Sequence, residues 1–173
     1  MSVPGIIETR QYLTFNLGDE SFALDVANVR EILEFTSVTK VPQTPEFMRG
    51  VINLRGSVVP VMDMRVKFNL AVGEKTVHTC IIVVEVTIGE ETTVLGALVD
   101  SVQEVFELEP GQIEPAPKIG TGLKTDFIKG MGKRDDRFII ILDIDRLFSE
   151  EELLMTDAIG EKTAEERSEA VNQ

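Results

Sequence analysis

Residues 46–63 decide the fold, and they read EFMRGVINLRGSVVPVMD. Residues 126–143 read DFIKGMGKRDDRFIIILD and match the first stretch position by position, without a gap. The identical pairs are Phe47/Phe127, Gly50/Gly130 and Asp63/Asp143, and Phe68/Phe148 follows in the same alignment. Two copies with so long a period do not suit a solenoid and favour two similar small β units packed on each other. Such a pair leaves a groove between its units, which is a natural recognition surface.

A second repeated segment lies upstream in each copy. Residues 29–35 read VREILEF, and residues 102–108 read VQEVFEL, so that Val29 aligns with Val102. One such match arises easily by chance, but two matches in the same order indicate an internal duplication.

Most of the chain has the pattern of β-strands. In residues 11–17, Leu13, Phe15 and Leu17 alternate with Tyr12, Thr14 and Asn16, which predicts a strand with one buried face. Further strands are expected at residues 22–24, 51–54, 58–64, 80–87, 93–99 and 137–142, with a short helix after Asp25. Pro60 has no amide donor, so its strand is expected at a sheet edge or unpaired at that position. Residues 109–125 are rich in proline and glycine and predict a long ordered loop.

The end of the chain predicts a helix and then a tail. Ser149 and Glu152 form a capping box, with Phe148 and Leu153 at the positions of a hydrophobic staple. From Thr156 onward the chain is polar and acidic, which predicts frayed helix or a flexible tail over residues 156–173.

Composition narrows the class of function. The 173 residues carry a net charge of −13, which repels phosphate backbones and anionic lipid, so neither nucleic acid nor a membrane surface is an expected partner. The apolar runs are far shorter than the roughly 20 residues that span a bilayer. No signal peptide is recognised, and the expected location is the cytoplasm. One cysteine excludes an internal disulfide and a multi-cysteine metal site.

Candidate catalytic and metal-binding groups are weak. His78 and Cys80 cannot complete a tetrahedral site alone and lack an orienting third group for nucleophilic chemistry. Residues 120–125 lack the Gly-Lys pair of a phosphate loop. Asp135, Asp136, Asp143 and Asp145 leave open a small carboxylate-metal hydrolase, which titration with magnesium, manganese and zinc would test. The expectation is a protein that is not an enzyme and needs no cofactor or metal.

Charge placement points to Arg55. The bases between residues 30 and 67 are expected mostly as solvated strand ends, and they are Arg30, Lys40, Arg49, Arg55, Arg65 and Lys67. Arg55 follows a strand and precedes Gly56, so a turn would hold its guanidinium outward, where its planar donors suit a carboxylate or carbonyl of a partner. The matching position in the second copy is Asp135, so the two copies differ in charge there.

Residues 42–65, PQTPEFMRGVINLRGSVVPVMDMR, closely resemble the signature region of CheW, the bacterial chemotaxis coupling family. Residues 11–17 (QYLTFNL) and 22–32 (FALDVANVREI) are similar to the opening strands of the family, and residues 136–148 (DRFIIILDIDRLF) to its closing strand. The resemblance implies a mainly β fold of two tandem SH3-like five-stranded β-barrels around a shared apolar core, with short helices and a C-terminal helix. We expect a domain over residues 9–155, with one barrel at about 9–71 and the other at about 76–148.

The resemblance also implies an adaptor between two proteins. The partners would be the cytoplasmic tip of a chemoreceptor (a methyl-accepting chemotaxis protein) and the regulatory domain of the histidine kinase CheA, with the adaptor recruited to membrane-bound receptor arrays. The same role in another chemosensory pathway, such as surface motility or gene regulation, is the alternative. The family motif places the receptor contact at Val29, Glu31 and Arg55, with Ile32 beside them and Leu98 and Val99 as weaker candidates. For the four apolar residues among these, ordinary core packing is the competing interpretation. Kinase contacts are expected at barrel edges, one on each half.

Overall fold

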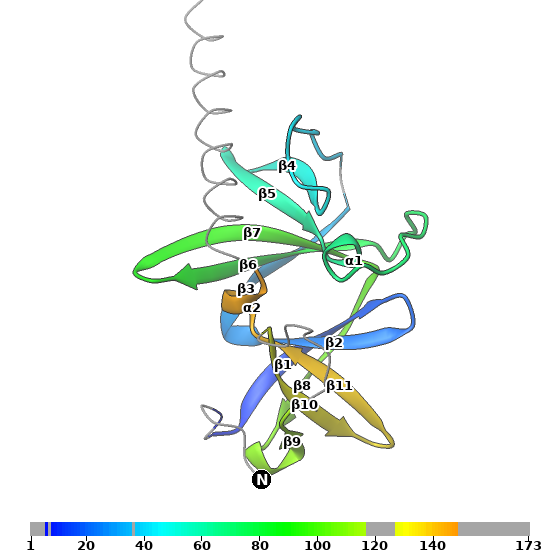
Figure 1. Ribbon diagram of the computed structural model, residues 1–173, viewed down its shortest axis with the longest axis vertical. Helices are drawn as coiled ribbons and strands as arrows, with labels where there is room; N and C mark the ends of the chain where they lie inside the picture. Colours follow the sequence, from blue (N-terminus) through cyan, green and yellow to red (C-terminus); the bar gives the residue numbers. More distant parts are fainter. Residues whose placement is uncertain (1–5, 7, 36, 117–126, 149–173) are drawn as a thin grey trace, which may run out of the picture.

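The computed structural model describes residues 6, 8–35, 37–116 and 127–148, which form two packed β-sheets with short helices (Figure 1). The six-stranded sheet has the order β8-β1-β2-β11-β10-β9, and the five-stranded sheet has the order β3-β6-β7-β5-β4. The six strands are β1 (Arg10–Leu17), β2 (Glu20–Asp25), β8 (Ser101–Leu108), β9 (Ile113–Glu114), β10 (Ile128–Arg134) and β11 (Arg137–Leu142). The five strands are β3 (Val29–Glu34), β4 (Met48–Leu54), β5 (Ser57–Asp63), β6 (Cys80–Ile88) and β7 (Glu91–Val99). The expected mainly β class with two sheets is confirmed.

The helices among the described residues are short. The α-helices are α1 (Met64–Lys67) and α2 (Ile144–Leu147), and the 3-10 helices are η1 (Val26–Asn28) and η2 (Pro110–Gln112). Asp25 caps η1 as expected, because its side chain accepts the amide hydrogen of Ala27 at 2.9 Å. In the part of the chain that the structure describes, no helix has the length and apolar character to cross a membrane. The predicted C-terminal helix and the predicted tail at 156–173 lie outside the described residues.

The first hairpin of each half of the chain belongs to the sheet that is formed mainly by the other half. The β1–β2 hairpin from the first half of the chain pairs with β8 and β11 from the second half. The β6–β7 hairpin from the second half pairs with β3 and β5 from the first. The sheets therefore do not follow the expected division at about 9–71 and 76–148. Those ranges mark the duplicated sequences, whereas each sheet takes a hairpin from the other copy.

The register shows that the duplication extends to the exchanged hairpins. In the six-stranded sheet Leu13 pairs with Val105, and in the five-stranded sheet Ile82 pairs with Ile32. Because Val105 aligns with Ile32 in the repeat, Leu13 of β1 corresponds to Ile82 of β6. The parallel pairing of β11 with β2 likewise matches that of β5 with β7. The molecule therefore has an approximate twofold arrangement of two copies of one strand set.

The β4–β5–α1 segment and its repeat, β10–β11–α2, share local backbone features. A register shift falls at Gly50 in β4 and at Gly130 in β10. Gly50 has φ 149°, and a Cβ there would lie 2.2 Å from the carbonyl oxygen of Thr39, so only glycine fits. Asp63 and Asp143 both cap the following helix by accepting an amide hydrogen two residues on. The identical residues of the repeat are thus those that its backbone geometry requires.

The largest apolar cluster lies between the sheets. It includes residues from both sheets, whereas each of the two smaller clusters belongs to one sheet. Strand β1 faces two cores: Leu13 and Phe15 are buried in the cluster between the sheets, and Tyr12 is buried in the cluster of the six-stranded sheet. The prediction that only one face of this strand is buried is therefore wrong. Alternate side chains of β1 point into two different apolar cores, because both faces of the sheet are covered.

Aromatic pairs cross between the two copies at this interface. Phe47 contacts Phe148 with ring centroids 5.8 Å apart, and Phe68 contacts Phe127 at 5.3 Å. The repeat exchanges one pair for the other, because Phe47 matches Phe127 and Phe68 matches Phe148. The four phenylalanines that the duplication retains are thus the ones that join its copies.

Several strand predictions need correction. Strand β5 lies between β4 and β7, so Pro60 is not on an edge strand, but pairing with β7 begins only at Val61. Strands β3, β8 and β10 had no predicted counterpart. The expected loop at 109–125 contains η2 and the short strand β9 in its described part.

The hairpin exchange predicts that neither half of the chain folds alone. A cut between residues 73 and 74, in an exposed loop, should give two fragments without stable sheets, because each lacks the hairpin that covers its edge. The fragments should recover sheet structure when they are co-expressed. Circular dichroism and gel filtration of each fragment and of the pair test this, and a stable monomeric fragment would contradict it.

Candidate functional site

The β4–β5 hairpin ends in a tight turn that presents Arg55. Leu54 pairs with Ser57, and the two central residues, Arg55 and Gly56, have φ of 51° and 89°. The side chain of Asn53 accepts the amide hydrogen of Gly56 at 2.8 Å and fixes the turn. Positive φ at both central positions is the geometry that matches the twist of a two-residue hairpin. The turn therefore holds Arg55 outward, as its sequence context predicts.

Arg55 makes a two-point ion pair with Glu31 on β3. Its two terminal nitrogens donate to the two carboxylate oxygens of Glu31 at 3.1 and 2.8 Å. The Arg55 side chain is 77% exposed and that of Glu31 is 24% exposed. A fork-shaped pair of this kind fixes the plane of the guanidinium. The pair joins the tip of one hairpin to an edge strand of the same sheet.

Strand β3 also presents an apolar residue, on the face opposite to Glu31. Its side chains alternate in exposure along the strand, and Ile32 is 44% exposed, whereas Val29 packs against the core between the sheets. Arg30, on the exposed face with Ile32, forms an ion pair with Glu85 on β6. The expected candidates Val29, Glu31 and Ile32 thus share the edge strand β3, and Arg55 reaches this strand from the β4–β5 turn through its ion pair with Glu31. Ile32 and the Glu31–Arg55 pair project from opposite faces of the strand, because they start from successive residues. These four residues are here called the β3 edge site.

Leu98 and Val99 do not belong to this surface. Both are fully buried, Leu98 in the core of the five-stranded sheet and Val99 in the core between the sheets. The expectation that they line a groove is corrected, because strand β7 is covered on both faces. Their competing interpretation as core residues is the one that fits their burial.

The second copy carries different charges at the matching positions. Asp135 occupies the place of Arg55 in the β10–β11 turn, with a φ of 55° against 51°. Glu104 matches Glu31 and pairs instead with Arg134, at 2.5 Å. The backbone of the site is therefore duplicated, but the exposed cation at the hairpin tip is not.

A buried arginine near the start of α1 was not expected from the sequence. Arg65 is 3% exposed and donates to both carboxylate oxygens of Asp63 at 3.1 Å and to Asp100 at 2.9 Å. The prediction of a solvated strand end is wrong for this residue. The hydrogen bond to Asp63 raises the pKa of Arg65 above its ordinary value, against the lowering effect of burial, so the guanidinium stays charged. A buried cation of this kind needs all its partners in place.

The four candidate metal ligands serve other roles. Asp143 caps α2, Asp145 accepts the amide hydrogen of Thr87 at 2.7 Å, and Asp135 lies with Asp136 in the β10–β11 turn. Across the described ranges, no three metal-ligating side chains gather around one point. Burial raises the pKa of the Cys80 thiol, whose sulfur donates to the carbonyl of His78 at 3.0 Å. A protonated thiol is a poor nucleophile and a poor metal ligand.

Comparison with known proteins supports the resemblance that residues 11–17, 22–32, 42–65 and 136–148 indicate. The family model for the CheW-like domain matches residues 11–152. The chemotaxis protein CheW of Klebsiella aerogenes is 37% identical over 154 residues, covering 87% of this chain and 89% of that protein. A probable chemotaxis protein CheW of Rhizobium etli is 35% identical, covering 83% and 90%. The crystal structure of the scaffolding protein TtCheW from Thermoanaerobacter tengcongensis matches with a TM-score of 0.73 and 36% identity, covering 83% of this chain and 94% of that one.

The exposure of the Glu31–Arg55 pair predicts a small contribution to stability. In a double-mutant cycle of Glu31→Gln and Arg55→Met, the coupling free energy should be below about 1 kcal/mol, because exposed ion pairs are screened by water. Urea unfolding of the four proteins measures it. A coupling of several kcal/mol would show that the pair holds the fold together rather than presenting a surface.

Proposed function

The chain belongs to the CheW family of chemotaxis adaptor and scaffold proteins, and we propose that it links the cytoplasmic tip of a chemoreceptor to the regulatory domain of the histidine kinase CheA. The family is non-enzymatic, so the work of the protein is to position its partners. It would bias the conformational equilibrium of the kinase through contacts that differ between kinase states. The place of action would be the cytoplasmic side of membrane-bound receptor arrays.

The β3 edge site is the proposed receptor contact. Its support is that the edge strand β3 carries both half-exposed Ile32 and the Glu31 side of the Glu31–Arg55 ion pair. An amphipathic helical hairpin could place an apolar side chain on Ile32, and the bordering charges would set its register. Val29, behind this surface, would support the position of the strand.

Arg55 can serve a partner while it stays paired with Glu31. The guanidinium has five N–H donors, and the two contacts with Glu31 leave others directed to solvent. Because Glu31 fixes the guanidinium plane, little side-chain freedom remains to be lost when a carboxylate or carbonyl of the receptor docks. Glu31 is in this proposal a positioning residue for Arg55.

The kinase contacts are proposed at the sheet edges, one in each sheet. The edge strands are β3 and β4 in the five-stranded sheet and β8 and β9 in the six-stranded sheet. An exposed edge offers unpaired backbone groups that another β-domain can cover. Two such edges, facing two kinase domains, would let the protein act as a bridge.

Reversing the charge of Arg55 tests the receptor contact. Arg55→Glu should weaken receptor co-sedimentation at least about tenfold and leave the melting temperature almost unchanged, because the side chain is exposed. The double variant Glu31→Arg with Arg55→Glu restores an ion pair with the charges exchanged. This double variant should still bind the receptor weakly if the receptor contacts the cation at position 55.

The matched control is Arg137→Glu, an exposed arginine at the start of β11 in the other sheet. It carries the same change of charge and should bind receptor fragments normally. Co-sedimentation with receptor fragments, with and without CheA, measures all three variants. Normal binding by Arg55→Glu, or an equal loss in the control, would remove the β3 edge site from the proposal.

A further inference from the structure

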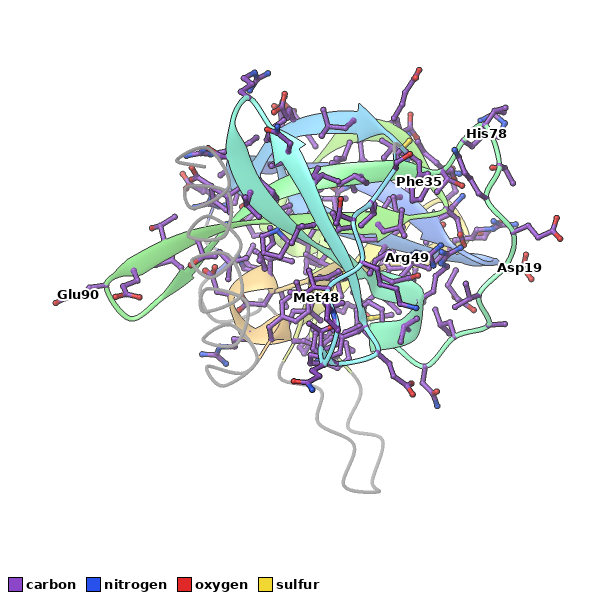
Figure 2. All side chains as sticks on the ribbon, turned by 90° about the horizontal axis from the view of Figure 1, so that it is seen from above. Asp19, Phe35, Met48, Arg49, His78 and Glu90 are labelled. Atoms are coloured by element: carbon purple, nitrogen blue, oxygen red, sulfur yellow. The ribbon has the colours of Figure 1, made fainter. Side chains whose placement is uncertain are left out.

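Each exchanged hairpin donates one backbone amide to a carboxylate that lies where the two sheets meet. The amide of Gly18, after β1, donates to Oδ2 of Asp100 at 2.6 Å, and the amide of Thr87, on β6, donates to Oδ1 of Asp145 at 2.7 Å. Gly18 and Thr87 are equivalent, because β6 repeats β1 in the alignment that the strand register gives. The tips of these hairpins, labelled by Asp19 and Glu90, project at opposite ends of the molecule (Figure 2).

At the Gly18 end, the hydrogen bond is part of a charged network. Asp100 lies between β7 and β8, and its other carboxylate oxygen accepts from the buried Arg65 at 2.9 Å. Arg65 is in turn held by Asp63, and the amide of Asp100 donates to the carbonyl of Asn16 at 3.1 Å. The network therefore joins α1 in the five-stranded half to the β1–β2 hairpin of the six-stranded sheet. Separating the sheets here would take Asp100 away from the buried Arg65 and leave it with Asp63 as its only carboxylate partner.

At the Thr87 end, the same positions hold residues that cannot form this network. Asp145 stands in the place of Arg65, and Ala27 stands in the place of Asp100. Asp145 reaches the hairpin amide directly; this hydrogen bond is exposed, as is that of Gly18 with Asp100, but no buried arginine binds Asp145 as Arg65 binds Asp100. The neighbouring ion pair of Arg146 with Asp143 joins residues of the same helix region and does not cross between the sheets. Separation here would break one hydrogen bond in contact with water, which replaces it readily.

The edge of β6 has no strand neighbour at Thr87. Pairing with β3 ends at Val84, so the outward amide of Thr87 depends on Asp145 in place of a strand. Beneath it, Ile144 and Leu147 of α2 are buried in the core between the sheets. Loss of the Asp145 contact would therefore be coupled to exposure of apolar surface from α2.

From this asymmetry we infer that the two sheets pivot about the Arg65–Asp100 network and separate transiently at the Asp145–Thr87 end. The duplication gives both ends the same strand framework, although Gly18 lies in the turn of its hairpin and Thr87 on a strand that continues to Ile88. The substitutions at 65/145 and 100/27 make the Arg65–Asp100 end the hinge and the Asp145–Thr87 end the latch. The inference concerns motion within the chain and does not depend on the proposed partners.

Amide hydrogen exchange of the full-length protein tests the inference, because the two equivalent amides are matched probes. After correction for intrinsic rates, Thr87 should be at least about tenfold less protected than Gly18. Exchange at Thr87 should also accelerate with urea below the unfolding transition, because the pivot exposes apolar surface, whereas exchange at Gly18 should follow global unfolding. Equal protection at the two amides, or urea-independent exchange at Thr87, would overturn the pivot.

Three variants sharpen the test. Asp145→Ala should raise exchange at Thr87 further and leave Gly18 unchanged. Asp100→Ala should bring the protection of Gly18 to within about tenfold of that of Thr87. Asp136→Ala, an exposed aspartate in the β10–β11 turn, is the control and should change neither amide. If Asp145→Ala altered both amides equally, the two ends would act as one unit and the hinge would be refuted.

Discussion

The exchange of hairpins between the two copies is the constraint on which the rest of the structure depends. Each sheet is completed by two strands from the other half of the chain, so the two halves of the chain cannot come apart without breaking backbone pairing. The aromatic pairs Phe47–Phe148 and Phe68–Phe127 then pack at the junction that the exchange creates. A protein that positions partners without chemistry needs surfaces at fixed separations, and an interlocked pair of sheets supplies them.

Duplication supplied the framework, and substitutions made its two halves unlike. The hairpin turns keep the same backbone, but Arg55 in one is Asp135 in the other. The second residue of the short helix is buried Arg65 in one copy and Asp145 in the other. The first difference gives only one half a cation at the first central position of its turn, and this is where the receptor contact is proposed. The second gives the two ends of the core different resistance to separation. The proposed functional residues thus lie where the copies diverge, while the shared residues maintain the fold.

Sequence alone predicted the duplication, the class of fold and the outward Arg55, because identical glycines, aspartates and phenylalanines mark turns, caps and packing. It did not predict strands β3 and β8, since residues such as Val29, Ile32 and Leu33 are spaced as on a helix face. The burial of Leu98 and Val99 could not be predicted either, because a continuous run of apolar residues can line a groove as well as fill a core. Arg65 and the hairpin exchange depend on partners far away in the chain, and no local pattern records which strand pairs with which.

Unfolding observed separately in each sheet tests the interlocked fold most directly. Tyr12, buried in the six-stranded sheet, is the single tyrosine and no tryptophan competes with it, while Phe35→Trp would report on the five-stranded sheet. Because both halves of the chain run through both sheets and one apolar core joins them, urea titrations followed by the two fluorophores should give coincident transitions with one midpoint. Two transitions with separate midpoints would show that the sheets unfold independently and would contradict the account.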